Sequence, residues 1–299
     1  MKPLHALIFA GVACVAISEA AAQATARTGN LKKIQDTGVI TLGYRESSVP
    51  FSYLDGEGKP VGYTMDLCAH IVDSIRKELN LPELKVVRQP VTASNRIPLI
   101  VNSTVDLECG STTNTAERQQ QVAFSVTTFV ATVKMMAKKK SGMDSISQLA
   151  GKNVALVSGS TAIPLIRAYE QEKGVSFREV AAKEYAEGFL LLQSDRVAAI
   201  AGDDVLLAGL AAKAKNTTDY TFLSPTLQSQ PYAIMLHKGD TELKAIVDRT
   251  LIGLMRSGEI ERLYHKWFFS PIPPSGMNMA FPMSAETRKA LANPNDKAE

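Results

Sequence analysis

Residues 108–125 have the sequence ECGSTTNTAERQQQVAFS and are the part of the chain from which the rest can be interpreted. A strand-like run at 104–107 precedes them, so residues 110–113 fall where a strand gives way to a helix. Such a junction offers free backbone N–H groups and hydroxyls. Asn114 or Thr115 can cap the next helix, and Arg118 lies one turn into it with a planar fork of donors. The stretch suits a carboxylate; the alternative is an ordinary turn with a solvated arginine.

Length and composition limit the kind of protein this is. The chain has 299 residues, of which 45% are hydrophobic and 21% charged, which is typical of a globular protein large enough for two lobes. The formal net charge of +3 is too small for a nucleic-acid binder. The basic run Lys138-Lys139-Lys140 has no interleaved aromatic residues and is interpreted as a solvated turn.

Residues 1–22 have the features of a secretory signal peptide. Lys2 precedes an apolar run from Leu4 to Ile17, and small residues follow as far as Ala24. We expect cleavage after Ala22 or Ala24, with lipidation at Cys14 as the alternative. The mature chain is therefore expected in the periplasm. It keeps Cys68 and Cys109, which either form a disulfide in that oxidising compartment or stay buried as free thiols.

The periodicity of the chain predicts alternating strands and helices. In the first part these are strands at 39–44 and 84–87, helices at 31–37, 65–79 and 92–102, and a hairpin around the turn 55–58. A strand at 128–137 leads to the lysine turn, near which we expect the first crossing between lobes. The second part has strands at 153–157, 177–181 and 196–202, a helix that begins at 161, and helices at 185–192 and 205–214. A strand at 231–236 then returns the chain to the first lobe, where helices at 240–256 and 259–268 and a tail that wraps this lobe follow.

Several polar side chains fall at the ends of these predicted strands. Arg45 and Arg96 occupy junctions comparable to that of Arg118, where open α/β sheets bind ligands. Residues 158–161, SGST, open a second helix able to hold an anion, and Asp203 ends a strand where it can meet an ammonium group or cap the next helix.

Four segments together resemble the periplasmic glutamate/aspartate-binding proteins of ABC transporters. They are residues 45–52 (RESSVPFS), residues 95–99 (NRIPL), the central ECGSTTN with Glu117-Arg118, and the closing Lys266-Trp267-Phe268 with residues 271–274 (PIPP). The resemblance covers about Leu31 to Lys297. It implies the type II periplasmic-binding-protein fold: two lobes, each a mostly parallel sheet flanked by helices, joined by two crossover strands that act as a hinge. The expected lobes are residues 31–134 with 235–299, and residues 135–234.

The resemblance also implies a role for each site residue. The ligand α-carboxylate would meet Arg118 with Thr113 and Thr161, and the α-ammonium would meet Asp203 with Ser111 and Thr113 nearby. The side-chain carboxylate would meet the two remaining arginines. The expected ligand-binding residues are Arg45, Arg96, Ser111, Thr113, Arg118, Ser160, Thr161, Tyr185 and Asp203.

This sequence departs from the family pattern at two positions. Ala93 replaces the usual serine, although Ser94 is adjacent, and Tyr185 replaces a histidine that helps to bind the distal carboxylate. Tyrosine donates one hydrogen bond but has no positive charge near neutral pH. This departure makes the amides glutamine and asparagine alternative ligands. With Arg45 and Arg96 both present we still expect an acidic ligand, because a neutral amide would leave the charge of two enclosed guanidinium groups uncompensated.

The expected function is a monomeric receptor that closes on L-glutamate or L-aspartate and presents it to a membrane permease. No cofactor or metal is expected. A secreted dehydratase or lytic enzyme on the same fold is the alternative, although the chain offers few groups placed for acid–base chemistry. A sensor domain for a signalling partner would use the same binding chemistry.

Overall fold

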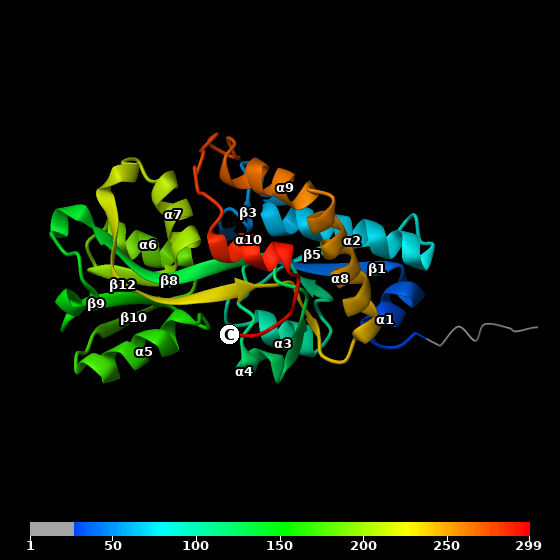
Figure 1. The fold of residues 1–299 in the computed structure, drawn as a ribbon, viewed down its shortest axis with the longest axis horizontal. Coiled ribbons are helices and arrows are strands. Elements are labelled where there is room, and N and C mark those ends of the chain that lie inside the picture. The colour runs from blue at the N-terminus through cyan, green and yellow to red at the C-terminus, as the bar shows by residue number, and fades with distance from the viewer. Residues whose placement is uncertain (1–26) are drawn as a thin grey trace, which may run out of the picture.

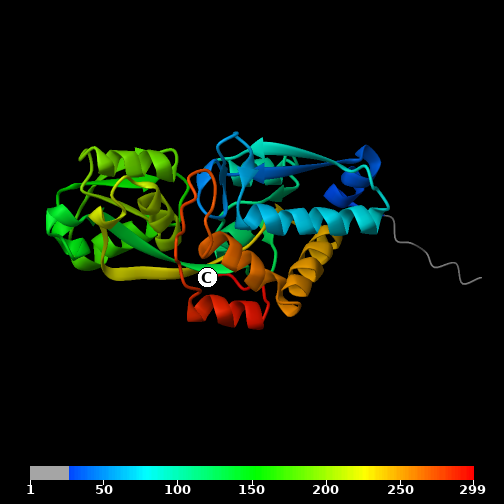
Figure 2. The same ribbon diagram turned by 90° about the horizontal axis from the view of Figure 1, so that it is seen from above.

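The computed structural model describes residues 27–299 and contains two lobes, each built on its own five-stranded sheet. Figures 1 and 2 show the lobes next to each other along the long axis of the molecule. The expected signal peptide and the alternative lipidation site at Cys14 lie outside the described residues. Within residues 27–299, every helix is too short or too polar to cross a membrane.

The first lobe has a sheet with the strand order β5-β1-β6-β13-β7. Strand β1 runs parallel to β5 and β6, whereas β13 is antiparallel to β6 and β7. The strands are β1 (Val39–Tyr44), β5 (Lys85–Pro90), β6 (Leu107–Glu108), β7 (Val122–Phe124) and β13 (Met235–His237). The helices are α1 (Gly29–Thr37), α2 (Tyr63–Leu79), α3 (Arg96–Val101), α4 (Ala116–Gln119), α8 (Thr241–Arg256) and α9 (Glu259–Phe268).

Helix α2 shows how the sequence produces this layer. Leu67, Ile71 and Ile75 recur at helical spacing and are fully buried against the sheet side, which confirms the predicted core-facing helix. Asn80 ends α2 in the left-handed conformation that suits a helix C-cap. The predicted hairpin is confirmed as β3 (Ser52–Leu54) and β4 (Pro60–Val61), and β2 (Ser47–Ser48) adds a third strand.

The second lobe has the strand order β10-β9-β11-β8-β12. Strands β10, β9 and β11 are parallel, and β8 and β12 return antiparallel, so both sheets are mixed, with three neighbouring parallel strands in each. The strands are β8 (Phe129–Lys138), β9 (Asn153–Val157), β10 (Arg178–Ala182), β11 (Ala199–Asp203) and β12 (Tyr220–Tyr232). The helices are α5 (Ala162–Lys173), α6 (Tyr185–Gln193) and α7 (Asp204–Lys213).

The chain passes between the sheets at residues 125–128 and again at 233–234, where β7 gives way to β8 and β12 to β13. The first passage therefore lies just before β8, and the expectation that it lies near the lysine turn at the far end of that strand was wrong. Two crossover segments join the lobes, as predicted. The proposed boundary at residue 134 falls within β8, and the division into lobes stays a prediction.

Strand β12 was missed by the sequence reasoning, which placed a single strand at 231–236. The structure instead has a 13-residue strand that ends at Tyr232, and a separate β13. Pro225 and Pro231 hide the pattern, but β12 is the edge strand of its sheet, where proline is tolerated. Its register also shifts between Leu223 and Gln228.

Two further boundaries differ from expectation. Residues 92–95 form a turn before α3 because Asn95 Oδ1 accepts a hydrogen bond from the Thr92 N–H at 2.7 Å, and such local side-chain bonds compete with helix. Strand β11 begins at Ala199 rather than at residue 196, and it ends at Asp203.

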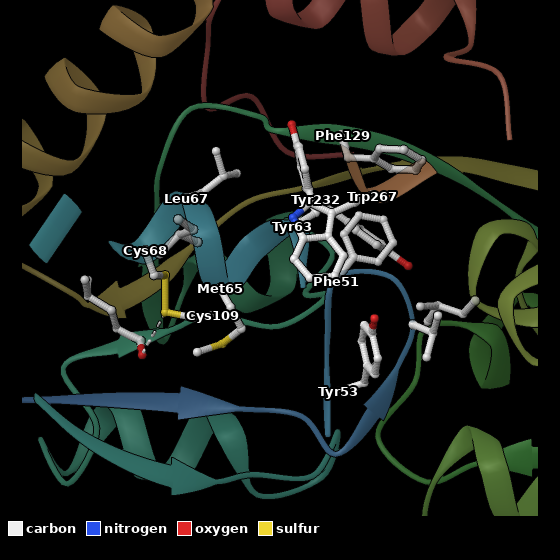
Figure 3. Close-up of a cluster of buried hydrophobic side chains, with 14 of the residues drawn as sticks. Phe51, Tyr53, Tyr63, Met65, Leu67, Cys68, Cys109, Phe129, Tyr232 and Trp267 are labelled. Carbon is white, nitrogen blue, oxygen red and sulfur yellow. Dashed lines mark hydrogen bonds between the residues drawn. A yellow bond between two sulfur atoms is a disulfide. The ribbon is translucent and has the colours of Figure 1, made fainter. Parts of the chain in front are cut away.

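An aromatic cluster fills the junction between the lobes (Figure 3). The Phe51 ring from the first lobe meets Phe129 edge-on, with 4.9 Å between ring centroids, and meets Tyr232 at 5.2 Å. Phe129 begins β8 and Tyr232 ends β12, so both crossover segments are packed on one rigid group of rings.

The tail does not only wrap the first lobe, as was expected. Helix α10 (Ala285–Ala292) lies over β8 of the second lobe in Figure 1, and the Thr287 hydroxyl forms hydrogen bonds with the Val130 backbone.

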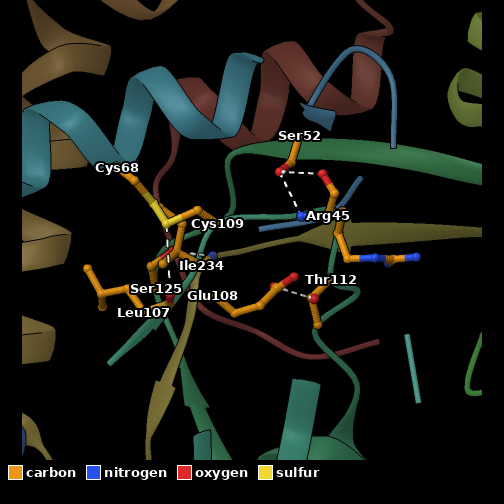
Figure 4. Close-up of a disulfide and its surroundings, with 9 residues drawn as sticks. All are labelled: Arg45, Ser52, Cys68, Leu107, Glu108, Cys109, Thr112, Ser125 and Ile234. Atoms are coloured by element: carbon orange, nitrogen blue, oxygen red, sulfur yellow. Dashed lines mark hydrogen bonds between the residues drawn. A yellow bond between two sulfur atoms is a disulfide. The ribbon is translucent and has the colours of Figure 1, made fainter. Parts of the chain in front are cut away.

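The open question about the cysteines is answered by a disulfide between Cys68 and Cys109 (Figure 4). Cys68 lies on α2 and Cys109 directly follows β6, and both are fully buried. The bridge therefore ties α2 to the start of residues 110–115, which carry several hydroxyl groups of the candidate site.

We expect the double variant Cys68→Ala/Cys109→Ala to lose about 2 to 4 kcal/mol of unfolding free energy, because the bridge closes a loop of 41 residues in the unfolded chain. Urea unfolding of the variant and of the oxidised wild type measures the difference. Two free thiols in the native oxidised protein, or equal midpoints for the two proteins, would contradict the bridge.

Candidate functional site

The candidate site lies between the lobes, where the strands of both sheets end. Arg45 follows β1, residues 109–115 follow β6, residues 158–161 follow β9, and Asp203 closes β11. Carboxyl ends of parallel strands are the usual position of ligand sites in open α/β sheets. All nine predicted site residues are found at these strand ends or at the helix starts that follow them.

Three arginines of the first lobe are buried in this region. The exposed fraction is 1% for Arg45, 3% for Arg96 and 8% for Arg118. An unpaired buried charge is unfavourable, so each guanidinium requires polar partners or a counter-charge. Burial and the neighbouring Arg118 lower the pKa of Arg96 to about 10, which leaves it charged at neutral pH.

Arg96 is held from within its own lobe. It donates to the Ser111 carbonyl at 3.3 Å and to the Thr112 hydroxyl. The Thr112 hydroxyl in turn donates to the Glu108 carboxylate, as Figure 4 shows. The second oxygen of Glu108 lies 4.0 Å from the Arg96 guanidinium. Gly110 allows this arrangement, because a Cβ there would collide with the Glu108 carboxylate and lie 2.8 Å from Arg45 Cγ.

Arg118 is oriented by the start of α4. Thr115 caps this helix by accepting from the Arg118 N–H at 3.2 Å, which selects Thr115 from the two predicted caps. The guanidinium donates to the Thr113 carbonyl at 2.9 Å and, across the cleft, to the Gly159 carbonyl of the second lobe at 3.1 Å. Burial lowers the pKa of Arg118.

Asp203 is the buried carboxylate of the second lobe, with 4% exposure. The Tyr185 hydroxyl donates a hydrogen bond to it at 3.4 Å, and the buried Tyr232 hydroxyl also lies beside it. Burial raises the pKa of Asp203 to about 6, although the neighbouring Tyr232 hydroxyl and the charges of Arg96 and Arg118 oppose this shift. The Tyr185 hydroxyl is thus directed at Asp203, while its ring fills the space beside Gly202.

Hydroxyl groups from both lobes meet at Gln230 of β12. Its Oε1 accepts from Thr113 at 3.1 Å and from Thr161 at 2.5 Å, so one side chain of a crossover strand joins the two threonines. Ser94, the candidate to compensate for Ala93, is exposed and lies 3.0 Å from the Thr92 hydroxyl instead.

Buried polar atoms without a hydrogen-bond partner gather in this region. They are Arg45 Nε, Arg96 Nε, Glu108 Oε1, Ser111 Oγ, Ser160 Oγ and Asp203 Oδ1. Native proteins satisfy nearly all buried polar groups, so such a set indicates a polar ligand. It offers cationic donors, hydroxyls and one carboxylate, which can receive carboxylates and an ammonium group together.

Beside these residues opens a cleft of about 650 Å³. Its walls come from both lobes and include Arg118, Ser160, Thr161 and Gln230, whereas the more deeply buried Arg45, Arg96 and Asp203 do not line it. Within the described residues, no group of three or more His, Cys, Asp or Glu side chains is arranged to hold a metal ion.

Sequence reasoning missed two residues of this region. Glu184 precedes α6 and pairs with Arg45 across the cleft, and Gln230 joins two threonines. Neither gave a local signal, because Glu184 sits at an ordinary helix start and Gln230 lies in the unrecognised strand β12.

Residues 40–270 match the family model of bacterial extracellular solute-binding proteins, family 3. The chain belongs to this family. It is 46% identical over 272 residues to the L-glutamate/L-aspartate-binding protein of Pseudomonas aeruginosa, covering 91% of this chain and 90% of that protein. It is 40% identical over 297 residues to the glutamate/aspartate import solute-binding protein of Escherichia coli, covering 99% and 98%.

A solved structure of a similar protein agrees with the fold. A mutant of ArgBP from T. maritima superposes with a TM-score of 0.71 at 26% identity, covering 80% of this chain and 99% of that one. The two-lobed type II fold predicted from the resemblance is therefore confirmed. Because the family and these relatives are solute-binding proteins, the enzyme alternative is set aside.

We expect Glu108→Ala to lower the unfolding free energy by about 3 kcal/mol, because it leaves Arg96 buried without its nearest counter-charge. Urea unfolding without ligand measures this loss. Glu117→Ala, which removes an exposed carboxylate from neighbouring α4, is the control and should cost less than about 0.5 kcal/mol. Equal small losses for both variants would contradict the pairing.

Proposed function

We propose that this family 3 solute-binding protein binds L-glutamate and L-aspartate in the cleft between its lobes. One observation carries the proposal: the buried Asp203 of the second lobe lies near the buried Arg96 and Arg118 of the first, and Arg45 is buried beside Arg96. A dicarboxylic amino acid has two anionic groups and one cationic group, which is the complement of that arrangement. The names of the two relatives above support the same ligand class.

The backbone groups of the ligand would be held by residues of both lobes. Arg118 would take the α-carboxylate with Thr113, Ser160 and Thr161, the last two at the start of the 12-residue helix α5. Asp203 would take the α-ammonium with Ser111, whose hydroxyl has no other partner. A ligand held in this way bridges the lobes and stabilises the closed form.

The side-chain carboxylate would lie toward Arg96 and Arg45. Arg96 is charged and buried, and its Nε has no partner in the described structure. Tyr185 contributes at most one hydrogen bond and no charge here, because burial and Asp203 raise its pKa. An enclosed guanidinium prefers a carboxylate to a neutral amide, which favours the acidic ligands.

We further propose that the protein is a monomer in the periplasm and delivers its ligand to a membrane permease of an ABC transporter. The signal-peptide features of residues 1–22 support export. The disulfide is consistent with an oxidising compartment.

Calorimetric titration of the mature protein, unfolded and refolded to remove bound amino acids, tests the proposal. We expect L-glutamate and L-aspartate to bind, with L-glutamine and L-asparagine as the comparison ligands. Arg118→Ala should weaken every ligand at least about tenfold, since it leaves the α-carboxylate without its charged partner. Binding of none of the four would refute the proposed ligand class.

Gly209 provides a test of lobe closure. A Cβ at this position of α7 would lie 2.9 Å from the Val49 carbonyl oxygen of the first lobe. We expect Gly209→Val to weaken all ligands at least about tenfold without lowering Tm, because valine suits a helix better than glycine does. Gly253→Val on α8, where nothing lies within 4 Å of the added Cβ, is the matched control. Unchanged affinity of the Gly209 variant would argue against closure.

Affinity should also depend on the ionisation of Asp203. With its pKa at about 6, the carboxylate that meets the ammonium group is mostly charged at pH 7 and mostly neutral at pH 5. Affinity for L-glutamate should therefore fall about tenfold when the pH is lowered from 7 to 5. Asp203→Asn should remove this dependence. A flat profile in the wild type would show that Asp203 does not titrate in the binding equilibrium.

The ligand-free protein should respond to pH in the opposite sense. The carboxyl pKa of Asp203 is raised from 3.8 to about 6, so the folded protein holds this proton more tightly than the unfolded chain. The contribution of Asp203 to stability is therefore present below pH 4 and is lost as pH rises toward 6.

A further inference from the structure

Arg45 and Glu184 form an ion pair that crosses the cleft. Arg45 follows β1 of the first lobe, and Glu184 directly precedes α6 of the second. The Arg45 Nη2 donates to Glu184 Oε2, and the Ser47 hydroxyl lies 3.4 Å from the same oxygen. The side chain of Arg45 is 1% exposed and that of Glu184 is 17% exposed, so the pair is largely shielded from water.

The two distal arginines receive their counter-charges from different lobes. Arg96 has Glu108 of its own lobe at 4.0 Å. For Arg45, Glu184 is the one carboxylate within ion-pair distance among residues 27–299. The counter-charge of Arg45 therefore comes from the second lobe, on the side of the cleft that also holds Asp203.

The pairing of Arg45 with Glu184 affects which ligand side chain Arg45 can bind. A ligand carboxylate that approaches Arg45 meets a guanidinium already paired and must share it with, or displace, a second carboxylate of the same sign. A side-chain amide carries no charge. Its oxygen can accept from Arg45 while its NH₂ group donates to Glu184, so both halves of the pair remain satisfied.

We propose that Glu184 is a specificity-determining residue that holds Arg45 from across the cleft and lowers the preference of the site for acidic over amide side chains. The inference rests on the proposed function, because it concerns the ligand that the cleft selects. Glu184, a residue of the second lobe, would thus set part of the preference between acidic and amide ligands, which the arginines of the first lobe alone would not determine.

The test is the ratio of the dissociation constants for L-glutamine and L-glutamate, measured by calorimetry on wild type and Glu184→Gln. Any effect of the pair on lobe closure weakens both ligands together and cancels in this ratio. We expect the ratio to rise at least tenfold in the variant, because L-glutamate no longer competes with a carboxylate for Arg45. Glu172→Gln removes an exposed carboxylate from α5 of the same lobe and should leave the ratio unchanged.

The possible results separate the two proposals. A ratio in Glu184→Gln within twofold of wild type, with binding retained, would overturn the role of Glu184 alone and leave it as a closure contact. A fall in the ratio would overturn it as well. Failure of wild type to bind any of the four amino acids would overturn the proposed function and this inference with it.

Discussion

Three guanidinium groups buried in one cleft are the constraint on which the rest of this structure depends. Burying a charge without a partner is costly, so Arg45, Arg96 and Arg118 must be compensated. The chain does this in three ways: a carboxylate from the same lobe for Arg96, a carboxylate from the other lobe for Arg45, and backbone carbonyls from both lobes for Arg118. The last arrangement contains no negative charge, and Arg118 is accordingly the arginine to which we assign the α-carboxylate.

The fold holds these groups at fixed positions within each lobe. Each arginine sits at the end of a strand or the start of a helix in a single lobe, and the disulfide fastens the segment after β6 to α2. Both crossover segments pack on the aromatic cluster around Phe51, and α10 backs β8 on the outside. The closure we propose would change the distance between these two sets of side chains, and the close approach of Gly209 to Val49 would limit how near the lobes come.

Much of the site could be predicted from sequence because its residues carry local signals. Arg45, Arg118 and Asp203 stand where a periodic apolar run ends, and a strand end in an α/β sheet is a ligand position wherever the sheet lies. What was missed depends on long-range pairing. Glu184 is 139 positions from Arg45, and strand β12 takes its place from pairing with β8 rather than from its own polar, proline-containing composition. The disulfide, which the sequence left open, likewise depends on two cysteines 41 positions apart. Neither helix nor strand propensity contains such information.

A crystal structure of the complex with L-glutamate is the most direct test of the claim that the buried guanidinium groups select the ligand. We predict closed lobes with the α-carboxylate on Arg118, the ammonium group on Asp203 and the side-chain carboxylate toward Arg96. A ligand whose carboxylates contact none of the three arginines, or one bound outside the cleft, would contradict it.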